Sequence, residues 1–211
     1  MKIIGLYSGK SSIIGPKNSP TGIFKDHVDS VQVDSLGIIG DVQADKRFHG
    51  GPEKALHQYA LRSYEKIIKR YPLLHKNAQP GAIGENITAT NMNDQNVCIG
   101  DIYQIGGVKV QVSSPRIPCW KIDEKFNQPD LNKFIGQNQI TGWYYRILES
   151  GSISLDDKVE LTLRPNAFLT ISLFMQIVRG EIKDNTVIKN AVRAAGLDPE
   201  WHRRLQKKYD P

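Results

Sequence analysis

The sequence predicts a mostly β fold, a β-barrel with a few helices, followed by a small C-terminal domain of three helices. Short stretches in which polar and apolar residues alternate, separated by glycine-rich turns, favour a barrel over residues 1–165. After Pro165 the apolar residues recur at helical spacing, which places the three-helix domain at residues 166–211. A chain of 211 residues is long enough for one main domain and a small second one.

Strand signals run along the first three quarters of the chain. An apolar run at residues 1–7 predicts the first strand. Residues 101–105 and 108–112 alternate with a period of two, and Gly106-Gly107 between them predicts a two-residue hairpin turn. Residues 159–163 alternate in the same way. Weaker strand candidates lie at residues 24–33 and 144–153.

One helix is predicted before the C-terminal region. Tyr64, Ile67, Ile68 and Tyr71 share one helix face within residues 61–71, and a proline follows directly. Because proline cannot continue a helix, we expect this helix to end there.

The C-terminal region carries three helix signals, each with its own start. The residues able to cap these helices are Thr170 or Ser172 for the first, Asp184 for the second and Asp198, followed by Pro199, for the third. Gly180 and Gly196 are expected to end the first two. Three such short helices bury little alone, so we expect them to pack on the barrel or on a partner.

Composition and charge limit the classes of protein. Lys and Arg number 28 and Asp and Glu 22, and the formal net charge of +6 permits an anionic ligand or nucleic acid. Clustered arginines interleaved with aromatic residues are absent, so we expect no nucleic-acid partner. No apolar run reaches the length of about 18 residues that a membrane span needs, and the N-terminal run is too short for a signal peptide. Two cysteines make no disulfide framework, which fits a cytoplasmic protein.

The most informative segment is residues 113–121, which holds one of the two cysteines. Cys119 follows Pro118 directly and lies near Arg116 and Lys121. Proline stiffens the backbone, and nearby cations favour the thiolate, the form that attacks electrophiles or binds soft metals. A half-buried structural cysteine is the alternative. Cys98 ends a short apolar run, where an inert buried cysteine is the usual occupant.

A second cluster surrounds a pair of glycines. Gly50-Gly51 lets backbone N–H groups approach a ligand closely, and His49 and Lys54 add positive charge. A tight polar turn capped by His49 is the alternative. The combination of ionisable groups around the glycines favours an anion site.

Two further clusters carry polar and aromatic groups. Gly84-Glu85-Asn86 is a glycine-containing turn with a carboxylate and an amide, a combination common in ordinary turns. Thr141, Trp143 and Arg146 offer a hydroxyl, an aromatic face and a guanidinium. They could line a pocket for a flat heterocycle, although an aromatic strand packed in the core is the ordinary alternative.

Several common sites are missing from the sequence. It has no Cys-x-x-Cys or His-x-x-x-His pair for structural zinc and no glycine-rich loop of the nucleotide-binding types. The phosphatase loop Cys-x5-Arg is also lacking, since Lys125 stands where its arginine would be. No flavin, haem or iron–sulfur motif is present.

Taken together, these residues resemble the MOSC family, named for the C-terminal domain of molybdenum cofactor sulfurases, and within it the bacterial YiiM-type branch. The matching pieces follow one another along nearly the whole chain: Gly40-Asp41-x-Gln43-Ala44-Asp45, His49-Gly50-Gly51, Gly84-Glu85-Asn86, Gly100-Asp101, Pro115-Arg116-x-Pro118-Cys119 and Gly142-Trp143-Tyr144. The tail, with Ala194-Ala195-Gly196-Leu197 and Trp201, is similar to the helical C-terminal region of that branch.

The resemblance implies a MOSC-type β-barrel followed by a three-helix domain. It also implies a molybdenum cofactor of the molybdopterin type, with Cys119 as the protein ligand to molybdenum. Members of this branch reduce N-hydroxylated compounds, including N-hydroxylated purine bases, with electrons from a separate reductase. The protein would then be a detoxifying oxidoreductase, and the missing flavin, haem and iron–sulfur motifs fit an external electron donor.

We expect the site to combine residues from separate segments. The expected catalytic residues are Cys119, which is also the metal ligand, and Asp41 and Glu85 as proton donors, with Asp45 as a further candidate for that role. The expected cofactor-binding residues are His49, Gly50, Gly51, Lys54, Asn86, Arg116, Thr141, Trp143 and Arg146. His49, Lys54 and Arg116 should meet around the cofactor phosphate, with Cys119 at the other end of the pocket.

Some alternatives stay open. The protein could bind the cofactor, or carry sulfur as a persulfide of Cys119, without turnover. The C-terminal helices could dock an acidic reductase or present an ordinary solvated face through their basic residues Arg203, Arg204, Lys207 and Lys208. The expected partners are a small N-hydroxylated substrate and the reductase, with no membrane, and the sequence is compatible with a homo-oligomer.

Overall fold

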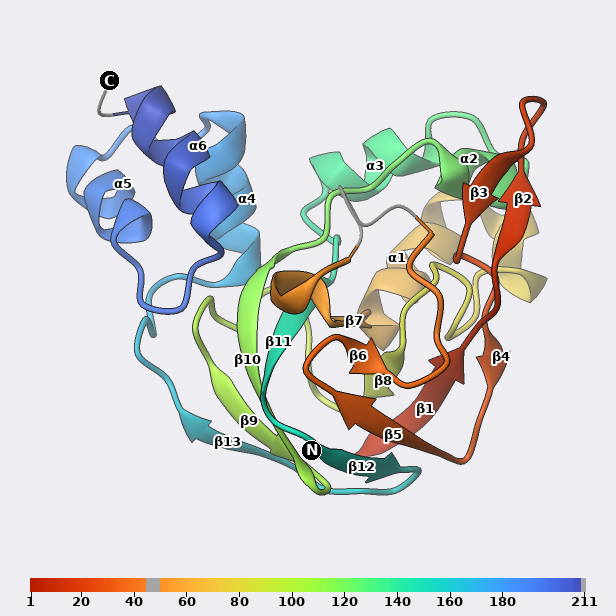
Figure 1. Ribbon diagram of the computed structural model, residues 1–211. Helices are drawn as coiled ribbons and strands as arrows, with labels where there is room; N and C mark the ends of the chain where they lie inside the picture. The colour runs from red at the N-terminus through yellow and green to blue at the C-terminus, as the bar shows by residue number, and fades with distance from the viewer. Residues whose placement is uncertain (45–49, 210–211) are drawn as a thin grey trace.

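The computed structural model describes residues 1–44 and 50–209, and a large mixed sheet forms its centre (Figure 1). In spatial order its eight strands are β13 (Val159–Leu163), β9 (Ile102–Ile105), β10 (Val108–Pro115), β11 (Trp143–Glu149), β7 (Leu56–Gln58), β8 (Ile87–Ala89), β1 (Ile3–Ser8) and β4 (Asp26–His27). A second sheet contains β12 (Gly151–Ser154), β5 (Ser30–Asp34) and β6 (Gly37–Ile38), and a hairpin pairs β2 (Ser12–Ile14) with β3 (Ser19–Thr21).

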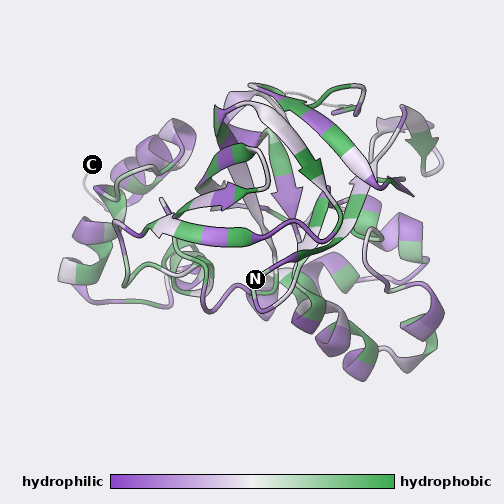
Figure 2. Cartoon of the chain, turned by 90° about the horizontal axis from the view of Figure 1, so that it is seen from below, coloured by the Kyte–Doolittle hydropathy of each residue, from purple (hydrophilic) through white to green (hydrophobic). Residues whose placement is uncertain are grey.

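The strongest strand predictions are confirmed. The strand β13 has the predicted bounds, and β9 and β10 pair antiparallel across the two-glycine turn, with Ile105 opposite Val108. The weaker candidates each overlap with two strands, residues 24–33 with β4 and β5, and residues 144–153 with β11 and β12. Hydrophobic and hydrophilic residues alternate along several of these strands (Figure 2), as expected for a sheet with one buried face.

The expectation of a barrel needs correction, because the large sheet does not close. Its edge strands β13 and β4 are not paired with each other. The first residues of the chain meet the start of β13 at an isolated bridge between Lys2 and Lys158, with hydrogen bonds of 2.9 Å from Ile3 N to Asp157 O and from Val159 N to Met1 O. Since β13 pairs with β9 along its length and β1 pairs with β8 and β4, no continuous ladder joins the two ends of the sheet. The fold is sheet-rich but open.

Six α-helices lie in the described ranges: α1 (Leu61–Arg70), α2 (Lys121–Phe126), α3 (Leu131–Gln137), α4 (Ile171–Arg179), α5 (Asn185–Val192) and α6 (Pro199–Tyr209). Two short 3-10 helices are η1 (Pro52–Lys54) and η2 (Pro72–Lys76). Within these ranges no helix has the length and apolar character that a membrane crossing requires. The predicted helix at residues 61–71 corresponds to α1, whereas α2 and α3 were not predicted.

The caps of the C-terminal helices follow the sequence signals. Thr170 caps α4, since its Oγ1 accepts a hydrogen bond from Leu173 N at 3.1 Å, and Gly180 ends this helix in the left-handed conformation. Asp184 caps α5 through the N–H groups of the first turn, and Asp198 precedes Pro199 at the start of α6. The helix α5 ends at Val192, a few residues before the glycine that was expected to stop it.

The three C-terminal helices do not form a core of their own. They gather on one side of the molecule, with α1, α2 and α3 on the other (Figure 1). One hydrophobic cluster joins the strands to these helices through Phe174, Ile177, Ile188, Trp201 and Leu205. The expectation that the helices pack on the sheet is therefore confirmed. The division into domains at residues 165 and 166 stays a prediction.

Candidate functional site

A small cavity of about 80 Å³, which we call the basic cavity, collects several predicted site residues from distant parts of the chain. Its cationic side chains are Lys25, Lys54, Arg116 and Lys121. Asp41, His57, Asn86, Cys119 and Tyr144 also line it. The predicted residues Asp41, Lys54, Asn86, Arg116 and Cys119 therefore meet at one place.

The segment between β10 and α2 presents Cys119 to the cavity. The backbone is fixed on both sides, by the hydrogen bond from Arg116 N to Gly142 O (3.1 Å) and by that from Ile122 N to Cys119 O (3.0 Å). The side chain of Cys119 is partly exposed, as a ligand or a nucleophile must be. The structure thus supplies the accessible thiol that the sequence analysis expected.

The other cysteine occupies a different environment. Cys98 is 1% exposed, and its thiol contacts the carbonyl oxygen of Ala167 at 3.6 Å. Burial raises the pKa of this thiol, and the charge of Asp101 raises it further. A buried thiol with a raised pKa is a poor nucleophile. The geometry agrees with the expected structural role of Cys98.

Arg116 brings a buried positive charge to the basic cavity. The residue is only 5% exposed, and its Nη1 atom has no hydrogen-bond partner in the described part of the chain. It lies close to Tyr144, whose pKa burial raises and the charge of Arg116 lowers. A buried guanidinium with an unused donor is costly unless an anion or another acceptor joins it. Arg116 is therefore suited to hold an anionic group.

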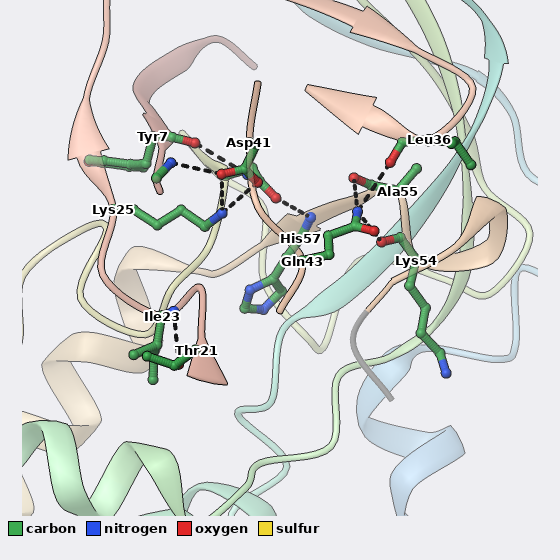
Figure 3. A network of polar contacts seen from close by, with 12 residues as sticks. Tyr7, Thr21, Ile23, Lys25, Leu36, Asp41, Gln43, Lys54, Ala55 and His57 are labelled. Carbon is green, nitrogen blue, oxygen red and sulfur yellow. Dashed lines mark hydrogen bonds and ion pairs between the residues drawn. The ribbon is translucent and has the colours of Figure 1, made fainter. Parts of the chain in front are cut away.

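The lining of the cavity also contains a buried ion pair (Figure 3). The carboxylate of Asp41 accepts bonds of 2.5 and 2.6 Å from Lys25 Nζ, and both side chains are nearly inaccessible. It also accepts hydrogen bonds from Gly9 N (2.7 Å) and Asn86 Nδ2 (2.8 Å). Burial lowers the pKa of Lys25, and the charge of Asp41 opposes this shift. Asp41 thus ties three segments together, and its role as a proton donor stays a prediction.

Gln43 places the loop that carries Lys54. Its Oε1 accepts a hydrogen bond from Gly51 N at 3.2 Å, and its Nε2 donates to the carbonyl oxygens of Leu36 (3.1 Å) and Lys54 (3.4 Å). In the sequence, Gln43 stands out only as part of a motif. Figure 3 shows the side chain of Lys54 extending away from Gln43, and its Nζ lies 3.2 Å from Glu200 Oε2.

The two glycines before Lys54 have backbone roles. A Cβ at Gly50 would lie 2.4 Å from Gln43 Oε1, and Gly51 has a φ of +86°. The backbone conformation of Gly51 therefore favours glycine, whereas a side chain at Gly50 would displace the amide of Gln43. Neither residue is among those that line the basic cavity, so their part in cofactor binding stays a prediction. His49 and Asp45 lie outside the described residues.

Arg146 connects segments next to the site. Its Nε donates to Glu53 Oε2 at 3.0 Å, and its Nη1 donates to Gln111 Oε1 (2.6 Å) and Gly196 O (2.8 Å). The guanidinium thereby joins η1, which ends at Lys54, to β10 and to the segment before α6. Arg146 is not among the lining residues of the basic cavity, and its contacts are those of a positioning residue.

Glu85 is buried behind the cavity. Its Oε1 accepts hydrogen bonds from Tyr64 Oη (2.6 Å) and Gly81 N (2.7 Å), whereas its Oε2 has no partner among the described residues. Burial raises the pKa of Glu85, which favours a protonated carboxyl. Its neighbours in sequence, Gly84 and Asn86, line the cavity, but Glu85 does not.

Similar proteins show the family of this chain. A family model described as a MOSC domain matches residues 45–160, more than half of the chain. The chain belongs to the MOSC family. Protein YiiM of Escherichia coli (strain K12) is 32% identical over 206 residues, which cover 97% of this chain and 91% of that protein. A reductase of Gibberella moniliformis is 36% identical over 75% of this chain, but the match covers only 28% of the fungal protein.

Solved structures extend the likeness to the whole fold. The crystal structure of YiiM from Geobacillus stearothermophilus has a TM-score of 0.82, with 30% identity over 99% of this chain and 98% of that one. The crystal structure of YiiM from Escherichia coli has a TM-score of 0.81 at 26% identity. This chain is therefore a YiiM-type MOSC protein, as the sequence resemblance indicated.

The matched MOSC region does not include every residue near the site. It contains Lys54, Arg116 and Cys119, whereas Asp41 precedes it and α4 to α6 follow it.

On α6, Arg204 pairs with Glu200, and Lys208 Nζ donates to Val178 O at 2.7 Å. Half of the basic residues expected to dock a reductase are thus engaged within this MOSC protein. Docking through them stays a prediction.

Two predicted cofactor-binding residues of this MOSC protein lie in the core. Trp143 and Thr141 are fully buried, and neither is among the residues that line the basic cavity. Asp94 Oδ1 accepts hydrogen bonds from Thr141 N (2.8 Å) and Gly142 N (2.9 Å). Asp94, which the sequence analysis missed, thereby holds the start of β11 and the carbonyl of Gly142 that fixes Arg116. The role of Thr141 and Trp143 in cofactor binding stays a prediction.

The buried carboxyl of Asp94 predicts a pH-dependent stability. Burial raises the pKa of Asp94 to about 6, against the hydrogen bonds from Gly142 and Thr141 that lower it. Because the folded state favours the protonated form, this contribution to stability is complete below the unfolded pKa of about 3.9 and is lost as the pH rises through about 6. The loss is on the order of 2–3 kcal/mol.

Asp94→Asn tests this expectation by chemical denaturation between pH 4.5 and 7. The wild type should lose more stability than the variant over this range, since the amide cannot ionise. Parallel stability curves for the two proteins would contradict the raised pKa.

Proposed function

We propose that this MOSC protein binds a molybdenum cofactor of the molybdopterin type and reduces N-hydroxylated compounds, such as N-hydroxylated purine bases. The observation that carries the proposal is the partly exposed thiol of Cys119 beside a cavity in which Arg116 has a buried donor without a partner among the described residues. The name of one similar protein, the reductase of Gibberella moniliformis, supports an oxidoreductase. The reaction would detoxify such bases in the cytoplasm.

The residues present fit such a cofactor. Arg116 and Lys54 would hold its phosphate, because both cations line the basic cavity and phosphate is a strong acceptor for buried donors. Cys119 would be the protein ligand to the metal, since a thiolate selects soft and high-valent centres. What the cofactor supplies when bound is a two-electron redox centre, recharged by a separate reductase.

The protein must also supply protons. Reduction of an N–OH group consumes two electrons and two protons, breaks the N–O bond and releases water. Burial raises the pKa of Glu85, so this carboxyl keeps its proton to a higher pH than an exposed glutamate does. Asp41, in contrast, is paired with Lys25. We therefore prefer Glu85 to Asp41 as the source of protons. The role of Asp41 would then be to hold the cavity wall in place through its ion pair with Lys25.

The test begins with protein made in a host that synthesises the cofactor. Metal and pterin should be present at about one each per chain, and the protein should reduce an N-hydroxylated adenine with reduced viologen as the electron donor. Cofactor without turnover would favour the alternative, a carrier of the cofactor or of sulfur. Protein without metal or pterin would contradict the proposal.

A further inference from the structure

A second cavity adjoins the basic one and extends to the C-terminal helices. Its volume is about 440 Å³, within the range of about 300–1,000 Å³ that is typical of small-molecule pockets. We call it the aromatic cavity, since Trp120, Tyr144 and Trp201 line it. Cys119 and Lys54 line both cavities. The thiol therefore lies where the two spaces meet.

The two tryptophans form walls of different character. Trp120 is 44% exposed, and a Cβ at Gly15 would lie 2.9 Å from its ring, so the indole rests against the turn between β2 and β3. Trp201, on α6, is nearly buried and meets Phe174 edge to face at 5.5 Å. One wall is thus anchored in the hydrophobic core, and the other offers an open aromatic surface.

Charged groups of α6 complete this cavity. The carboxylate of Glu200 lies between Lys54, at 3.2 Å, and Arg204, with which it is ion-paired. The guanidinium of Arg204 also lies 5.3 Å from the centre of the Trp201 ring. A carboxylate held in this way can accept hydrogen bonds from the N–H groups of a ligand, and aromatic walls favour flat rings.

We propose that the aromatic cavity is the substrate pocket and that Trp120, Trp201 and Glu200 select flat nitrogen heterocycles that carry the N–OH group. This inference rests on the proposed function and adds the place and the residues that would bind the ring of the substrate. It also gives α6 a direct part in the site, in addition to the reductase docking or solvated face that the sequence left open for the C-terminal helices.

The division of labour between the cavities follows from their residues. The basic cavity holds the buried donor of Arg116 that has no partner within residues 1–44 and 50–209, which suits an anion site. Arg116 and Cys119 lie within the region matched by the MOSC model, whereas Glu200 and Trp201 lie beyond it. The residues that follow the matched region thus contribute to the lining of the aromatic cavity and not to that of the basic cavity.

The test compares two substrates in the cofactor-loaded protein with reduced viologen as donor. Hydroxylamine presents the same N–OH group without a ring. In Trp120→Ala and Glu200→Gln, the ratio of kcat/KM for an N-hydroxylated adenine to that for hydroxylamine should fall about tenfold. Phe168→Ala is the matched control, because Phe168 is also 44% exposed but is not among the residues that line either cavity. Its ratio should equal that of the wild type.

A binding measurement separates this inference from the proposed function. Adenine, which has no N–OH group, should quench the tryptophan fluorescence of the wild type, and Trp120→Ala should lose most of that change. If the wild type reduces neither substrate, the proposed function fails while the quenching still tests the pocket. An unchanged ratio and unchanged quenching in the variants would overturn the inference. So would loss of pterin from Trp120→Ala, since the cavity would then hold the cofactor.

Discussion

Replacing Cys119 by serine should abolish the reduction of N-hydroxylated bases and greatly weaken metal retention. A serine hydroxyl is a hard donor that stays protonated near neutral pH, so it does not replace a thiolate as a ligand to molybdenum. The thiol is partly exposed and lies at the edge of the cavities rather than in the core. The free energy of unfolding should therefore change by no more than about 1–2 kcal/mol. Metal analysis and denaturant unfolding of the same preparation measure both effects.

Cys98→Ser is the matched control, because it makes the same chemical change in the core. Cys98 is 1% exposed, so a hydroxyl at this position should lower stability and leave turnover intact. Equal losses of activity in the two variants would show that the assignment of the functional thiol to Cys119 is wrong.

The parts of the fold that the sequence predicted are those fixed by local chemistry. Thr170, Asp184 and Asp198 cap helices through side-chain bonds to N–H groups only a few residues away. The strand β13 alternates strictly and has the bounds that alternation predicts. Signals of this kind depend on a few consecutive residues, and the sequence contains them in full.

The parts that were missed depend on distant contacts. The helices α2 and α3 are six and seven residues long, too short for a clear apolar period, and they exist because Phe126 and Leu131 pack in one cluster with residues of α1. Closure of a barrel depends in the same way on which strand edges meet. Alternation shows which face of a strand is buried but not which strand lies beside it.

The site shows the same limit. Unusual combinations, such as a cysteine after proline and arginine, identified Cys119 and Arg116. The sequence alone does not show whether Trp143 lies in the core or in a pocket. Its burial depends on the strands β10 and β7, which lie on either side of β11. Lys25 and Glu200 gave no local signal at all, since their partners Asp41 and Lys54 lie 16 and 146 positions away.

Replacing Arg116 by methionine should separate cofactor binding from stability. The guanidinium is the buried cation best suited to the cofactor phosphate, and loss of such a partner costs about 2–5 kcal/mol of binding free energy, more than a tenfold weaker retention. In cofactor-free protein, however, the same change removes a buried charge whose Nη1 has no partner among the described residues. Methionine fills similar volume with apolar atoms, so the melting temperature should stay the same or rise.

Arg164→Met is the matched control, because we expect it to lower stability without affecting cofactor binding. Arg164 donates to the fully buried carboxylate of Asp101 at 2.9 and 2.7 Å and is not among the residues that line either cavity. Its removal leaves that carboxylate short of donors, so stability should fall by about 3 kcal/mol while pterin and metal remain bound. Thermal unfolding of cofactor-free protein and pterin content of loaded protein measure the two effects. If Arg116→Met instead destabilises the cofactor-free protein as strongly as Arg164→Met and keeps its pterin, Arg116 is a structural residue and the anion site lies elsewhere.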